Sequence, residues 1–143
     1  MPGITSNVAS IITRMNRRKA AVTRELSAAA RVLALEIGAE SKRVMQTEIY
    51  NVPEKRTKAG KKAWRRTGNL KRAESARAEG VVIILRNNAR YAAARYTLGT
   101  SANKREVRPP QRSVQWQEEA IARRRARILQ VRREHVMRAL TRP

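Results

Sequence analysis

The sequence predicts an α+β fold: a long N-terminal helix, a small antiparallel β-hairpin, a short helix and a long C-terminal helix. Apolar residues recur at gaps of three, four and seven in residues 8–50 and again in 113–140, which is the period of one helix face. Between them, Val81–Leu85 is the only strongly apolar run and is typical of a strand. At 143 residues, we expect a single domain spanning 1–143.

The first helix is expected over residues 8–50. Ser6 or Asn7 can cap it by accepting a hydrogen bond from an orphan backbone N–H. Gly38 weakens the helix by roughly 1 kcal/mol and is a position where it can bend. The helix is expected to end near Asn51, because a proline two residues later pushes its predecessor out of helical geometry. Its apolar stripe can cover the chain's own sheet or contact another subunit, and both can hold along different halves.

A strongly basic segment follows at residues 54–66. Seven of its thirteen residues are Lys or Arg and no apolar period exists, so we expect a loop. It is either a solvated charge run or a loop that contacts phosphates. Trp64 either anchors packing or stacks on a base. The basic residues are Lys55, Arg56, Lys58, Lys61, Lys62, Arg65 and Arg66.

Residues 67–100 are expected to form the hairpin and a short helix. The Thr67 hydroxyl can cap a short turn that carries Leu70. Glu79 and Gly80 form a plausible two-residue hairpin turn, since glycine supplies the positive φ that such turns require. The strand at Val81–Leu85 is apolar on both faces, so we expect it to be covered on two sides.

The last helix is expected over residues 113–140, after a short helix at 91–96 that ends near Gly99. Ser113 can cap it, and Glu118 and Glu119 suit the positive end of the helix dipole. Its arginines either pair with glutamates of neighbouring subunits or face nucleic acid. The arginines expected at such a partner or subunit contact are Arg123, Arg124, Arg125, Arg127, Arg132 and Arg133.

The composition indicates two kinds of partner: polyanions and other subunits. The net charge is +22, which attracts polyanions and repels other copies of the chain. Phe is absent and aromatics make up 3% of the residues, so the core must be lean. Long helices on a lean core often gain their remaining burial from subunit contacts.

Catalysis is not expected. The sequence contains no Asp and no Cys, which removes the usual carboxylate metal sites, thiolate zinc sites and Cys nucleophiles. His135 is the sole histidine and lies among arginines, and we expect it to be an inert surface residue. We therefore expect no enzyme activity, no cofactor and no metal. No apolar run approaches 18 residues and no secretory signal is evident, so we expect a soluble product made in a cytoplasm.

A set of short motifs occurs in a characteristic order. After the long helix come Val52-Pro53, Thr67-Gly68-Asn69-Leu70, Tyr91-Ala92, Leu98-Gly99-Thr100 and Arg108-Pro109-Pro110. This order resembles the tail-completion or neck proteins of long-tailed bacteriophages, over about residues 8–140. The sequence departs from that family at Thr97 and Leu98, where Glu and Phe are usual, and in its longer basic loop. The motif residues are Thr67, Gly68, Leu70, Tyr91, Ala92, Gly99, Thr100 and Pro109.

The resemblance implies a structural virion protein at the head–tail junction, assembled in the host cytoplasm. Such proteins form rings, commonly of six copies, around the channel that DNA traverses. They join the portal-side connector or stopper to the tail terminator and tube. A ring of basic chains suits a DNA lumen, because contact with the phosphate backbone is non-specific and requires only Lys and Arg near phosphates.

Two alternatives remain. The first is a free-standing basic nucleic-acid-binding protein, which composition favours but which the few aromatics and the absence of a known recognition module disfavour. The second is that the arginines serve only acidic protein partners. In that case, charge reversal of Arg124 and Arg125 is expected to block head–tail joining without altering DNA affinity.

Overall fold

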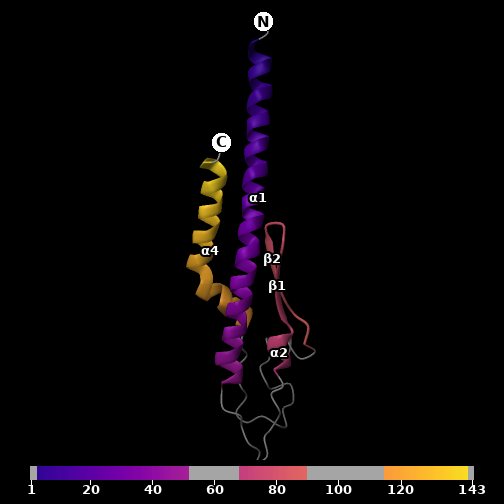
Figure 1. Cartoon of the computed structure of the whole chain (residues 1–143), viewed down its shortest axis with the longest axis vertical. Helices are drawn as coiled ribbons and strands as arrows, with labels where there is room; N and C mark the ends of the chain where they lie inside the picture. The colour runs from indigo at the N-terminus through magenta and orange to yellow at the C-terminus, as the bar shows by residue number, and fades with distance from the viewer. Residues whose placement is uncertain (1–2, 52–67, 90–114, 142–143) are drawn as a thin grey trace, which may run out of the picture.

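The computed structural model describes residues 3–51, 68–89 and 115–141 (Figure 1). The helix α1 forms the long axis, with the helix α4 along one side and the hairpin of β1 and β2 along another. The predicted α+β architecture is confirmed. The elements are α1 (Gly3–Met45), η1 (Gln46–Tyr50), α2 (Asn69–Arg72), β1 (Glu74–Glu79), β2 (Val82–Asn87) and α4 (Trp116–Thr141).

The first helix begins earlier than its apolar stripe. It starts at Gly3, so Ser6 and Asn7 lie inside it and the capping role predicted for them is wrong. The helix extends beyond the stripe because residues 3–7 contain no proline to interrupt the backbone hydrogen bonds.

The far end of this helix is a single π-helical turn, η1. The Asn51 N–H donates to the Gln46 carbonyl oxygen at 2.8 Å, one residue wider than an α-helical bond. The Gln46 side-chain amide also donates to Asn51 Oδ1 at 2.7 Å. The predicted end of the helix near Asn51 is therefore confirmed.

The core is lean and is built around the second half of α1. Its buried members there include Ala29, Leu33 and Ile37, and α4 adds Ala120 and Val131. Alanine at these positions lets the two helices approach closely, but each alanine buries little apolar area. The largest fully buried side chain of the described residues is that of Trp116, at the start of α4.

The two strands form an antiparallel hairpin. Glu79 pairs with Val82, so the two-residue loop is Gly80-Val81. The predicted turn at Glu79-Gly80 is therefore one residue too early, because Glu79 continues the ladder. Gly80 has the positive φ, +59°, that the turn prediction required of it.

Only one face of the hairpin packs on the helix layer. Ile83 and Leu85 contact the core, whereas Val82 on the opposite face is 57% exposed. The expectation that both faces of this strand are covered is wrong for Val82. A two-stranded sheet beside one long helix has only one face turned toward that helix.

Gly38 lies where α1 meets β1. A Cβ built on Gly38 would lie 2.8 Å from the Cβ of Ala76, closer than real side chains approach. The helix therefore carries a glycine, despite its cost to helix stability, because the strand passes at this point.

The short helix α2 carries Leu70 into the core, where it is 1% exposed. Gly68, not Thr67, occupies the N-cap position, with a φ of +74° that favours glycine. The Asn87 amide donates to the Leu70 carbonyl oxygen at 2.7 Å and so ties α2 to β2.

Candidate functional site

Most of the predicted functional residues lie outside the described part of the chain. The DNA-facing loop falls between residues 51 and 68, so its role stays a prediction. The short helix at 91–96 and the cap at Ser113 also lie outside the described residues. The predicted loop residues concerned are Lys55, Arg56, Lys58, Lys61, Lys62, Arg65 and Arg66.

The family motif is described only at its start. Gly68 and Leu70 are placed as an N-cap and a core residue, which are structural positions. The other motif residues, which lie outside the described ranges, are Thr67, Tyr91, Ala92, Gly99, Thr100 and Pro109.

The predicted arginines of α4 divide between two faces. Arg124 and Arg127 turn toward α1 of the same chain. Arg124 donates from Nε and Nη2 to Glu40 Oε2 at 3.1 and 2.9 Å. Arg127 Nη2 donates to Glu36 Oε1 at 3.2 Å, and this hydrogen bond raises the pKa of Arg127. In the single chain, these two arginines already have carboxylate partners.

Arg123 bridges three glutamates. Its Nε donates to Glu119 Oε1 at 2.8 Å, and its Nη atoms lie 3.7 Å from Glu48 and 3.9 Å from Glu40. The hydrogen bond to Glu119 is the largest cause of a raised pKa for Arg123. These pairs extend the seam between α1 and α4 toward η1.

His135 belongs to the same seam. Its Nδ1 lies 2.8 Å from Glu25 Oε2, with both side chains largely buried, and Arg138 approaches the same oxygen at 3.8 Å. The expectation of an inert surface histidine therefore missed its role as a packing residue. No local sequence pattern could predict the contact between His135 and Glu25, because the two residues are 110 positions apart.

The remaining predicted arginines form what we call the outer arginine face of α4: Arg125, Arg132 and Arg133. All three are exposed and form no ion pair within the described residues. Of the six arginines predicted to contact a subunit or partner, these three are the ones that the fold leaves open to a second molecule.

Sequence reasoning missed a buried carboxylate at Glu74, the first residue of β1. Its side chain accepts hydrogen bonds from four groups: Ser41 Oγ at 2.8 Å, Asn87 Nδ2 at 2.8 Å, Gln117 Nε2 at 2.9 Å and Trp116 Nε1 at 3.2 Å. The donors come from α1, β2 and α4. Glu74 therefore joins all four major elements at one point, which is a structural role.

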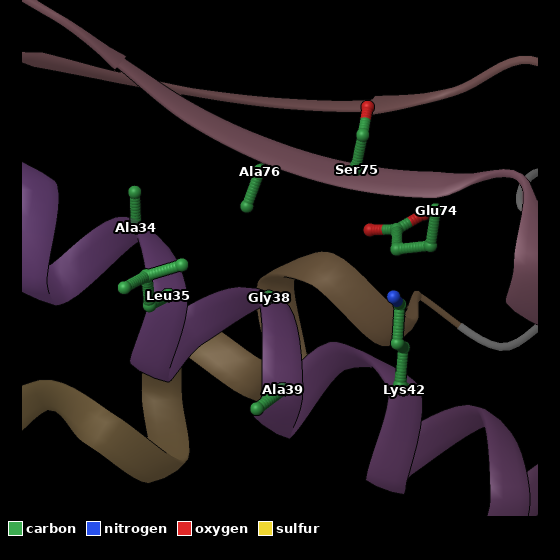
Figure 2. Close-up of a pocket in the computed structure, with 8 residues that line it drawn as sticks. All are labelled: Ala34, Leu35, Gly38, Ala39, Lys42, Glu74, Ser75 and Ala76. Atoms are coloured by element: carbon green, nitrogen blue, oxygen red, sulfur yellow. The ribbon is translucent and has the colours of Figure 1, made fainter.

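A pocket of about 430 Å³ opens beside Glu74, between α1 and β1 (Figure 2). Small side chains such as Ala34, Ala39 and Ala76 line it, and Figure 2 shows Lys42 rising from α1 toward the strand. Ser75 Oγ already donates to the Arg86 carbonyl oxygen at 3.1 Å. The charged groups of the lining are the Lys42 ammonium and the Glu74 carboxylate.

Within 3–51, 68–89 and 115–141, no group of three or more His, Cys, Asp or Glu residues could hold a metal ion. No helix in those ranges is long and apolar enough to cross a membrane.

The fold and the ion-pair seam define a helical pair with a small hairpin and an unbalanced positive surface. Against known proteins, no family model matches the chain, and no curated protein or solved structure matches it either.

Proposed function

We propose that this chain is a structural virion protein of the phage neck or tail. In this role, copies form a ring, commonly of six, that completes the tail or joins head to tail around the DNA channel. Its neighbours are the connector or stopper and the tail terminator or tube. The proposal joins the resemblance in motif order to the charge distribution of the fold.

One observation carries the proposal: the glutamates of α1 and η1 are engaged inside the chain. Glu25, Glu36, Glu40 and Glu48 all face basic groups of α4. The exposed surface is therefore left with an excess of positive charge, in a chain whose net charge is +22. A closed ring of such copies repels itself unless a polyanion lies in its centre. DNA meets that requirement through its phosphates alone.

The basic loop at 54–66 is assigned to the lumen in this proposal. Seven positive charges within thirteen residues can neutralise phosphates without reading bases. The outer arginine face of α4 is assigned to acidic surfaces of the neighbouring virion proteins or to DNA.

Neutralising four loop residues tests the lumen role. Particles carrying Lys55→Gln, Lys58→Gln, Lys61→Gln and Lys62→Gln are expected to assemble rings normally but to retain or inject less DNA. Ring assembly is read by electron microscopy and DNA retention by nuclease protection. Unchanged DNA retention and injection would contradict the assignment of the loop to the DNA channel.

The second candidate is a free-standing basic nucleic-acid-binding protein, favoured by the charge alone. Size-exclusion chromatography with light scattering separates the two. A multi-copy species supports the ring. A stable monomer or dimer, whose duplex affinity falls steeply with salt, supports the second candidate.

The third candidate is that the arginines contact only protein partners. Reversing Arg124, as the sequence alone suggested, would also break its pair with Glu40 inside the chain. Arg125→Glu with Arg132→Glu confines the change to the outer arginine face. Loss of head–tail joining with unchanged duplex affinity supports protein contact, whereas loss of duplex affinity supports DNA contact.

A further inference from the structure

The first part of α1 projects beyond the rest of the fold. All residues from 7 to 20 are exposed, and Figure 1 shows this part of the helix extending past the end of α4. We call residues 7–20 the N-terminal arm. An isolated helix of this length is marginal in water, because most helical stability in proteins comes from packing an apolar face.

The arm carries an apolar stripe that nothing in the described chain covers. Val8, Ile11, Ile12 and Met15 are between 49% and 64% exposed. Their spacing of three and four residues places them on one helix face. Further along α1, the same stripe is buried against α4 and the hairpin. The arm therefore continues the face that packs on α4 and the hairpin, but no described residue covers it there.

The charge bordering the stripe changes sign along α1. The first acid of the chain is Glu25, whereas five basic residues precede it. Arg14 and Arg18 follow Ile11 and Met15 by three positions and lie at the edge of the stripe, whereas Lys19 follows Met15 by four and lies at its far end. The acids of the second half match the basic residues of α4. A helix that covers the arm must instead supply acids.

A second copy of this chain does not fit that requirement. Another arm is equally basic, and the basic helix α4 would meet the arm with like charge. The acids of the second half of α1, and Glu48 of η1, are engaged with α4 of their own chain. Duplex DNA supplies negative charge but no apolar groove for Ile11, Ile12 and Met15.

We propose that the N-terminal arm binds an acidic amphipathic helix of a different protein. The occupant covers Val8, Ile11, Ile12 and Met15 with its own apolar stripe and places glutamates or aspartates beside Arg14, Arg18 and Lys19. This is recognition of a helix through apolar anchors spaced three and four residues apart, with flanking charges that select the partner. The inference goes beyond the ring and does not depend on it.

The test uses the full chain and a designed peptide as the probe. The peptide is an amphipathic helix of about 14 residues, about the length that the arm can contact. It carries Leu on one face and Glu on the borders, with a fluorescent label for anisotropy. Binding is expected with a Kd on the order of micromolar.

Matched variants of the chain locate the binding. Ile11→Ser with Ile12→Ser is expected to weaken the peptide affinity at least about tenfold. Leu35→Ser is the control, because Leu35 is an apolar residue of the same helix, 74% exposed, outside the arm. It is expected to leave the affinity unchanged. Equal affinity for all three chains would overturn the proposal.

Matched peptides separate the two contributions. A peptide with Lys in place of Glu, and one with Ser in place of Leu, are both expected to bind at least about tenfold more weakly. Equal binding of the Lys peptide would overturn the charge argument, and equal binding of the Ser peptide would overturn the apolar one.

Three further measurements address the other occupants. Sedimentation equilibrium reads self-association, and flotation reads binding to phosphatidylserine vesicles. Anisotropy reads binding to a duplex. The proposal fails if the acidic peptide does not bind and the Ile11→Ser, Ile12→Ser variant loses self-association, vesicle binding or duplex binding. The arm would then bind a second copy, a membrane surface or DNA instead. Peptide binding that is lost only in this variant supports it.

Discussion

Glu74 shows how much one side chain contributes to the arrangement of the elements. A carboxylate at 3% exposure is costly to bury unless it is hydrogen-bonded, and four donors from three other elements supply those bonds. Each donor is correctly placed only when α1, β2 and α4 all lie in their native positions. Glu74 thus favours one docking geometry of a small core over its alternatives.

Replacing Glu74 with glutamine is expected to lower the free energy of unfolding by about 2–4 kcal/mol. The new amide NH₂ faces groups that are themselves donors, so at least one buried donor loses its acceptor. Urea denaturation followed by circular dichroism measures the change. The control is Glu79→Gln in the exposed end of β1, expected to cost at most about 0.5 kcal/mol. Equal losses in both variants would contradict the role of Glu74.

Gly38 is expected to resist replacement by alanine, although alanine is the better helix former. The added methyl group would meet Ala76, so Gly38→Ala should destabilise the fold by about 1–3 kcal/mol. Adding Ala76→Gly reopens the space, so the double variant should lose less stability than the sum of the two single variants. Thermal unfolding of all four proteins measures this coupling. Additive losses would show that the two residues do not compete for space.

At the scale of elements, the seam between α1 and α4 combines a narrow apolar contact with a ladder of ion pairs. Three glutamates of α1 and Glu48 of η1 meet basic residues of α4 in antiparallel order: Arg123, Arg124, Arg127 and His135. Surface ion pairs contribute little singly, but the carboxylate of Glu40 is largely buried and shared by several arginines. The ladder therefore fixes which face of α4 turns inward.

Arg124 and its neighbour Arg125 offer a matched pair on α4. Arg124→Ala is expected to cost about 1–2 kcal/mol, because it removes two hydrogen bonds to the largely buried Glu40. Arg125→Ala removes the same charge from an exposed position and should cost at most about 0.5 kcal/mol. Urea titrations of both variants provide the comparison. A larger loss of stability for Arg125→Ala than for Arg124→Ala would contradict the assignment of Arg124 to the inward face of α4.

At the scale of the whole molecule, α1 belongs to two environments. Its second half is the centre of the core, whereas the N-terminal arm stands clear of every described element (Figure 1). A helix without tertiary contacts opens with little free energy, while a core helix opens only with the whole fold.

Hydrogen exchange should divide α1 accordingly. Amides of residues 7–20 are expected to exchange at least about 100-fold faster than those of residues 29–45, because no described residue outside α1 packs on the arm. Mass spectrometry of the isolated chain measures this difference. The acidic helical peptide should slow exchange in the arm alone. Uniform protection along α1 in the isolated monomer would contradict the division.

The sequence by itself determined the elements. The period of apolar residues predicted both long helices, and the apolar run with Gly80 predicted the hairpin, because these signals are local and depend on backbone geometry. The boundaries shifted by a few residues, since the ends of a helix depend less on the apolar stripe than on the absence of a breaker. The roles predicted for the basic loop at 54–66 stay predictions.

Only the tertiary structure decided which charges face which partner. Arg124 and Glu40 are 84 residues apart, and Trp116 and Glu74 are 42 apart, so no local pattern pairs them. A helical period shows that one face is apolar but does not name what covers it. The packing of α4 and the hairpin covers half of α1 and leaves the arm bare, because the last turns of the antiparallel α4 lie beside Glu25, in the middle of α1.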